Sequence, residues 1–284
     1  FTWVGNERLV YLLTRDNLYA SGLFAVARDN LADSMPVNQF DAVQVLGSPR
    51  ARPDSLFVWV RREARNSGRP GPLVEVNLKR RFRAGFDVDY TLPRDNLHEP
   101  DVDEVIGWLR DHEGEIRYAI GHRQGLVGLH RREASGKWTA LKLDPNVDRP
   151  LAVDPTDPQA LLVAHVAPDG ACELVRYRTT DDTRGPVIYR DAKYDFSNAR
   201  VITAPDTEGG IVGLTYAQQA PATFWLRDEE AALQASVDRA LPPNRVNLVV
   251  GRSRDGRRVL VHSSSDRHPG SIYLFDFSTG KIRQ

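Results

Sequence analysis

The sequence contains almost no sulfur and no long apolar run. Its 284 residues include one cysteine, Cys172, and one methionine, Met35. A single cysteine cannot form a disulfide within the chain, which excludes a disulfide-stabilised scaffold. No stretch approaches the roughly eighteen consecutive apolar residues of a membrane-spanning helix, so we expect no membrane span. We expect Cys172 to be a small buried hydrophobic residue in a strand.

The chain also has no surplus of charge of either sign. Lys+Arg and Asp+Glu are both 38, and the net charge is therefore zero. A nucleic-acid-binding protein usually has a basic surplus, so we expect no nucleic-acid partner. The one dense basic run, Lys79 to Arg83, carries a single aromatic residue and is better explained as a solvated strand end. Most basic residues are arginines, a bias that suggests a bacterial source.

Short apolar or alternating runs dominate the sequence instead. Each has four to six residues rich in branched and aromatic side chains, which is typical of β-strands, and polar, Gly or Pro residues separate the members of each pair. The predicted hairpin pairs are Leu9–Leu13 with Leu23–Ala27, Leu56–Val60 with Leu73–Leu78, Val105–Leu109 with Ile116–Ile120, Leu126–His130 with Trp138–Leu143, Leu161–Val166 with Leu174–Tyr177, Ile211–Tyr216 with Thr223–Leu226, and Val259–Ser263 with Ser271–Asp276.

These hairpins recur at a spacing of about fifty residues, with tips near positions 17, 66, 134, 169, 219 and 267. A period of that length with about four strands per unit is typical of β-propeller blades. A parallel α/β fold would need helices between the strands, and a two-sheet sandwich would not explain the period. We therefore predict an all-β propeller of about six four-stranded repeats, with five or seven blades as alternatives. We expect residues 1–284 to form a single domain.

One segment has a helical pattern. In Glu229–Ala240, apolar residues fall on one face at Leu233, Val237 and Leu241, and Pro242 follows. The sequence predicts a short helix inserted between blades, with Asp228 as its N-cap and its apolar face on a sheet edge. Glu229 and Glu230 are the candidate binding residues, because two adjacent carboxylates can capture the free amine of a peptide. The helix dipole favours acidic residues there equally well without any function.

The sequence offers no complete catalytic or metal site. No Gly-x-Ser-x-Gly motif occurs, and Gly251–Gly256 has the wrong spacing and is expected to form a turn. The segment His262–His268 contains Ser, His and Asp, but seven consecutive residues on one hairpin cannot converge as a hydrolytic triad. A loose group of acidic and histidine residues, His112, Glu113, Glu115, His122 and His130, lacks the spacing of a zinc site. We expect no catalytic residue, no metal and no cofactor.

The C-terminal third resembles a known family. Val259–Asp276, with its His-Pro-Gly-Ser-Ile-Tyr segment, is followed by Ser278-Thr279-Gly280-Lys281, and this looks like the last propeller blade of the prolyl oligopeptidase family of serine peptidases. Two further segments resemble blades of the bacterial acylaminoacyl-peptidase and dipeptidyl-peptidase-like members of this family. They are Ile211–Tyr216 with Phe224–Leu226, and Val105–Arg117.

The resemblance implies a non-catalytic propeller. In the family the catalytic Ser, Asp and His lie in an α/β-hydrolase domain, and no part of that domain is present in this sequence. The implied role is to gate substrate access to that domain, so the implied partners are peptide substrates and the hydrolase domain of a longer parent chain. The chain begins at Phe1, within a strand-like segment, and we expect it to be a fragment that lacks its first blade. The alternative is a free-standing, TolB-like propeller that binds a protein or ligand. A cytoplasmic and a periplasmic location fit the composition equally.

Overall fold

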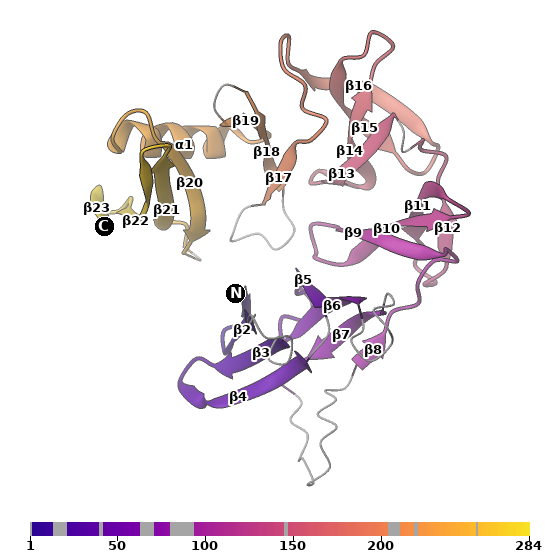
Figure 1. Cartoon of the computed structure of the whole chain (residues 1–284), viewed down its shortest axis with the longest axis horizontal. Coiled ribbons are helices and arrows are strands. Elements are labelled where there is room, and N and C mark those ends of the chain that lie inside the picture. The colour runs from indigo at the N-terminus through magenta and orange to yellow at the C-terminus, as the bar shows by residue number, and fades with distance from the viewer. Residues whose placement is uncertain are drawn as a thin grey trace. The chain divides into compact units, whose positions relative to one another are not determined.

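The computed structural model describes residues 2–13, 22–39, 42–62, 71–79, 94–144, 147–203, 211–218, 221–253 and 255–284. The chain divides into two compact units, Phe1–Lys142 and Leu143–Gln284. Each unit consists of antiparallel sheets in which strands that follow one another in the chain are neighbours in the sheet (Figure 1). Six such sheets follow one another along the chain, and the predicted fold class, an all-β propeller of six blades, is confirmed.

The first unit holds three four-stranded sheets. Sheet 1 is made of β1 (Thr2–Val4), β2 (Arg8–Leu13), β3 (Gly22–Ala27) and β4 (Asn30–Gln39). Sheet 2 is made of β5 (Ala42–Gly47), β6 (Ser55–Arg62), β7 (Leu73–Asn77) and β8 (Arg94–Asn96). Sheet 3 is made of β9 (Glu104–Arg110), β10 (Ile116–Arg123), β11 (Leu126–Arg132) and β12 (Trp138–Ala140).

The second unit holds two four-stranded sheets and, within the described residues, one three-stranded sheet. Sheet 4 is made of β13 (Asp148–Asp154), β14 (Asp157–Val166), β15 (Cys172–Arg178) and β16 (Thr183–Arg190). Sheet 5 is made of β17 (Arg200–Thr203), β18 (Ile211–Ala217) and β19 (Pro221–Trp225), and α1 (Asp228–Ala240) follows it. Sheet 6 is made of β20 (Val246–Arg252), β21 (Arg258–Ser265), β22 (His268–Asp276) and β23 (Lys281–Arg283).

The predicted hairpins are confirmed, with one error in the repeat. All seven predicted pairs form antiparallel ladders. The tip assigned near position 134 joins the third and fourth strands of sheet 3, whereas the other tips join second and third strands. The equivalent turn lies at Gln124 and Gly125, both with positive φ. This misassignment made the predicted period irregular. The tips near 17, 66 and 219 lie outside the described residues.

Sheet 2 shows why some strands read as continuous apolar runs. In β6, Leu56 and Val58 pack in a core with residues of sheet 1, whereas Phe57 and Trp59 pack in a second core with residues of sheet 3. Successive side chains of a strand point to opposite faces. A strand buried on both faces therefore loses its apolar–polar alternation, and Ser55–Val60 has no charged residue.

The β9–β10 turn is built around one buried carboxylate. Oδ1 of Asp111 accepts hydrogen bonds from the backbone N–H groups of Glu113 and Glu115, both at 2.9 Å, and Oδ2 accepts one from Arg117 at 2.6 Å. Gly114 has φ +76°, and a side chain there would collide with the backbone of Ser48. The turn at residues 111–114 therefore depends on both its aspartate and its glycine.

The helix α1 is confirmed, but its predicted N-cap is wrong. The helix begins at Asp228, and Arg227 is the N-cap, without a side-chain hydrogen bond to the first turn. Val237 and Leu241 are buried and Leu233 is partly buried, in a core that includes Val259 and Val261 of sheet 6. Near them, Gln234 donates to the backbone oxygen of Asn247 on β20, the edge strand of sheet 6. The apolar face thus packs on sheet 6, as the helical pattern predicted.

Candidate functional site

The two candidate glutamates occupy different environments. Glu230 is buried, and its Oε2 accepts a hydrogen bond from Nη2 of Arg252 at 2.7 Å. The side chain of Glu229 is 74% exposed, and its nearest cation is Arg227 at 3.7 Å. Adjacent residues on a helix point about 100° apart, so one carboxylate faces sheet 6 and the other faces solvent. The amine-binding hypothesis stays a prediction, and in this arrangement an incoming amine would share Glu230 with Arg252.

The Ser/His/Asp segment lies on a single hairpin. Ser263 on β21 is fully buried, and its Oγ has no hydrogen-bond partner among the described residues. His262 packs against Gly270 of the paired strand β22, where a Cβ would collide with the ring. The hydroxyl of Ser265 accepts a hydrogen bond from the backbone N–H of Arg267, and Nδ1 of His268 accepts one from the backbone N–H of Gly270. The geometry offers no activated serine in this segment.

The acidic and histidine group of sheet 3 is spread over strands and turns. Glu115 pairs with Arg52 at 2.9 Å and Glu113 pairs with Arg50 at 3.8 Å, while His130 lies on β11. Burial lowers the pKa of His130, and the charge of Arg123 lowers it further. Within the described ranges, no group of three or more His, Cys, Asp or Glu side chains could hold a metal ion.

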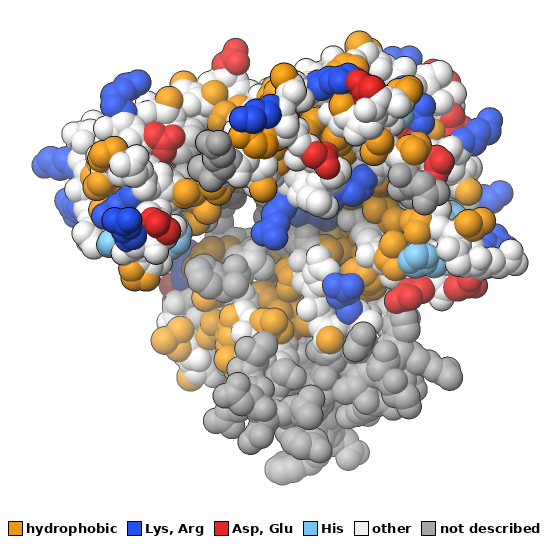
Figure 2. Space-filling view, turned by 45° about the horizontal axis from the view of Figure 1, so that its top comes forward, with side chains coloured by type: hydrophobic (Ala, Val, Ile, Leu, Met, Phe, Trp, Pro, Cys, Tyr) orange, Lys and Arg blue, Asp and Glu red, His pale blue; other side chains and the backbone are white. Residues whose placement is uncertain are grey.

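The basic run is largely outside the described residues. Only Lys79 is described, and its Nζ pairs with Asp54 at 2.8 Å, while residues 80–83 are not described. On the face shown in Figure 2, Lys and Arg side chains are scattered among Asp and Glu side chains. Among the described residues, no helix is long and apolar enough to cross a membrane.

Sequence analysis missed a carboxylate network in the second unit. Oδ2 of Asp191 accepts hydrogen bonds from Tyr216 at 2.7 Å and Gln218 at 3.0 Å, and Oδ1 accepts from the backbone N–H groups of Lys193 and Tyr194. The Tyr216 hydrogen bond, followed by the two backbone ones, holds the pKa of Asp191 well below its usual range. The network links the end of sheet 4 to sheet 5. All four of these donors form hydrogen bonds to the Asp191 carboxylate, so we interpret the network as structural.

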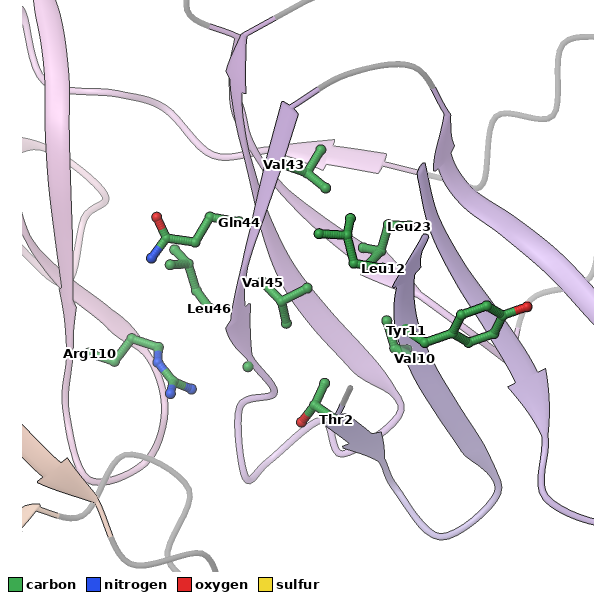
Figure 3. A pocket seen from close by; sticks show the side chains of 11 residues that line it. Thr2, Val10, Tyr11, Leu12, Leu23, Val43, Gln44, Val45, Leu46 and Arg110 are labelled. Atoms are coloured by element: carbon green, nitrogen blue, oxygen red, sulfur yellow. The ribbon is translucent and has the colours of Figure 1, made fainter. Parts of the chain in front are cut away.

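Sequence analysis also missed a cavity in the first unit. A cavity of about 530 Å³ lies between sheets 1 and 2 (Figure 3). Its apolar wall is formed by side chains of β2, β3 and β5: Val10, Leu12, Leu23, Val43 and Val45. Leu12 is 51% exposed, so this wall is open to solvent. The volume lies within the range of small-molecule sites, about 300–1,000 Å³.

The polar groups that line this cavity come from four strands, with Tyr11 on β2 and Gln44 on β5. Thr2 lies on β1, Gly47 ends β5 and Arg110 ends β9. Figure 3 shows the Arg110 side chain at one end of the cavity. Gly47 has φ +104°, and a Cβ at this position would collide with the guanidinium of Arg110. No sequence pattern links these residues, because Thr2 and Arg110 lie on different sheets. This cavity is therefore a candidate ligand site in the first unit.

Known structures support the fold of this chain, but no comparison assigns the chain to a family. No protein-family model matches the chain, and no curated protein matches it. Among solved structures, the chain is similar to the β-propeller domain of the Trilobed protease from Pyrococcus furiosus, with 10% identity, a TM-score of 0.51, and coverage of 98% of this chain and 77% of that one. It is also similar to a puromycin-hydrolyzing peptidase of Mycobacterium tuberculosis, with 12% identity, a TM-score of 0.50, and coverage of 99% of this chain and 45% of that one.

A third similar structure is TolB from Acinetobacter baumannii, with 10% identity, a TM-score of 0.41 and coverage of 99% of this chain. The chain spans about half of that protein, 53%. The β-propeller domain of the Trilobed protease thus shares the fold of this chain.

Proposed function

We propose that this chain is the non-catalytic propeller domain of a longer serine peptidase of the prolyl oligopeptidase family, and that it selects which substrates reach a separate α/β-hydrolase domain. In this proposal residues 1–284 act as one propeller domain. The observation that carries it is the succession of six meander sheets, five with four strands, over the whole chain. The similarity in fold to the propeller domain of the Trilobed protease, which extends over 98% of this chain, supports it.

The physical role of such a domain is exclusion. A propeller over an acyl-transfer site admits short or unfolded peptides, keeps folded proteins out, and limits the water around the reacting groups. This role requires no nucleophile in the propeller. It agrees with the burial of Ser263.

The parent gene provides the first test. The proposal requires a hydrolase domain with a Gly-x-Ser-x-Gly motif within a few hundred residues after Gln284. A stop codon directly after Gln284 would contradict it and favour a free-standing binding propeller.

Kinetics of the parent protein provide the second test. The full-length parent should be compared with a variant that lacks residues 1–284, on a short chromogenic peptide and on unfolded casein. Active-site titration with a fluorophosphonate normalises both preparations to functional serine. We expect deletion to raise the ratio of casein to peptide cleavage by about tenfold, because exclusion is lost. An unchanged ratio in a folded deletion variant would contradict gating.

A further inference from the structure

We propose that the cavity between sheets 1 and 2 binds a ligand with a carboxylate next to an aliphatic side chain, namely the C-terminal residue of a short peptide. The existence of a carboxylate site rests on the cavity itself. The choice of a peptide as the source of that carboxylate rests on the proposed function.

The charge of the cavity selects an anion. Arg110 is the only charged residue among those that line it. A guanidinium presents five N–H donors in a planar fork that matches a carboxylate, so Arg110 can bind one beside its existing partners. Among the described residues that line the cavity, none is acidic.

The position of Arg110 is fixed by the backbone. Gly47 has no side chain, and the guanidinium occupies the space that a Cβ would fill. Its φ of +104° is unfavourable for any other residue, so the sequence requires glycine here. The glycine thus leaves room for the guanidinium at the edge of the cavity, where Figure 3 shows Arg110.

The apolar wall of the cavity favours a ligand in which an aliphatic side chain lies next to the carboxylate. Val10, Leu12 and Val45 present branched aliphatic side chains to the cavity. Phosphate or sulfate would leave the apolar wall without a partner. A leucine or valine side chain next to a carboxylate would instead bury the apolar wall. The volume of about 530 Å³ accommodates one or two residues of a peptide and no folded protein.

Calorimetry on the purified chain tests the proposal. The ligands are N-acetyl-Ala-Leu with a free carboxylate, the same dipeptide as its C-terminal amide, and 4-methylvalerate, an aliphatic acid without a peptide. We expect the free acid to bind and the amide to bind at least tenfold more weakly. Arg110→Gln should weaken binding of the acid at least tenfold. The matched control is Arg123→Gln on β10, whose exposed side chain pairs with Asp101 outside the cavity, and it should bind as the wild type does.

Methyl NMR keeps the test decisive if Arg110→Gln does not fold. In the wild-type chain, the acid should shift the methyl resonances of Val43 and Val45, and the amide should not. Equal binding of acid and amide, unshifted valine methyls, or wild-type affinity in folded Arg110→Gln would each overturn the site. Binding of 4-methylvalerate without binding of the peptide acid would overturn the peptide assignment. All these measurements use the chain without a catalytic domain, so their failure is distinguishable from failure of the gating experiment on the parent.

Discussion

Arg252 on β20 and Glu230 on α1 form an ion pair at 2.7 Å, with side chains only 14% and 8% exposed. The pair joins the helix to the edge strand of sheet 6. Its partners are 22 residues apart in the chain, and most of α1 lies between them. A buried charge that loses its partner is far less favourable than an exposed one, so this contact should matter more than surface pairs.

Glu230→Ala should therefore lower the free energy of unfolding by about 3 kcal/mol, since the Arg252 guanidinium would lose its buried counter-charge. Urea unfolding followed by circular dichroism measures this. Glu229→Ala is the matched control, because the neighbouring side chain is 74% exposed and its removal should change stability by less than about 0.5 kcal/mol. Equal losses of unfolding free energy in Glu230→Ala and Glu229→Ala would show that the buried ion pair contributes no more to stability than an exposed glutamate does.

The apolar face of α1 supports a second prediction. Val237→Asp should cost more than about 3 kcal/mol, because Val237 is fully buried against the core of sheet 6, and Leu233→Asp should cost about 2 kcal/mol at its partly buried position. Ala235 is exposed, so Ala235→Asp should cost only about 0.7 kcal/mol of helix propensity. Thermal unfolding gives the melting temperature of each of the three variants and so ranks their stabilities. A melting temperature of Val237→Asp equal to that of Ala235→Asp would contradict the packing of the helix.

The Asp191 network predicts an acid-dependent loss of stability. Hydrogen bonds, above all from Tyr216, lower the pKa of Asp191 in the folded state. The unfolded carboxylate titrates near pH 3.9, so the contribution of Asp191 is present above about pH 4 and is lost as the pH falls toward the folded pKa.

Asp191→Asn should accordingly reduce the slope of unfolding free energy against pH between about pH 2.5 and 4.5. Urea titrations at a series of pH values measure that slope. Asp101→Asn, which alters a carboxylate that is 92% exposed, is the control and should keep the wild-type slope. A slope that Asp191→Asn leaves unchanged would mean that the network does not couple to folding.

Cys172 should be nearly inert in the folded protein. It is 6% exposed, and burial raises the pKa of its thiol to about 11. The thiolate is the reactive form, so reaction with a chromogenic disulfide at pH 8 should be at least about a hundredfold slower than in denaturant. Because the chain has one cysteine, the signal has a single source. Equal rates in buffer and in denaturant would place Cys172 on the surface.

The chain alone should not hydrolyse aminoacyl or peptidyl chromogenic substrates. Ser263 is fully buried, and the hydroxyl of Ser253 donates to Asp255 at 2.6 Å in the turn that precedes β21. Among the described residues, Oγ of Ser263 has no hydrogen-bond partner and Oγ of Ser253 bonds to Asp255 and Arg258, so neither has the histidine base that acyl transfer requires. A fluorophosphonate probe should leave the protein unlabelled, as judged by intact mass. Stoichiometric labelling of Ser253 or of any serine in 263–265 would refute this prediction.

Local patterns in the sequence were sufficient to predict the strands, the hairpins and the helix. The pairing of Leu161–Val166 with Leu174–Tyr177 follows from two apolar runs around a Pro-Asp-Gly turn, and α1 follows from the spacing of Leu233 and Val237. These elements depend on residues that are close in the chain, so alternation and turn chemistry carry the necessary information. The error at the N-cap of α1 is local too, because Asp228 lies one residue inside the helix, in the first turn, where the helix dipole also favours acidic side chains.

Only the tertiary structure decided which side chains meet. Nothing in the sequence places Arg110 beside Gly47, Tyr216 beside Asp191 or Arg252 beside Glu230, since each pair joins segments separated by other strands or by a helix. Such contacts are set by how one sheet packs on the next and by the register of the strands, and a shift of one residue would turn each side chain to the opposite face. The sequence therefore determined the repeating sheets, and packing between sheets determined the cavity and the buried charges.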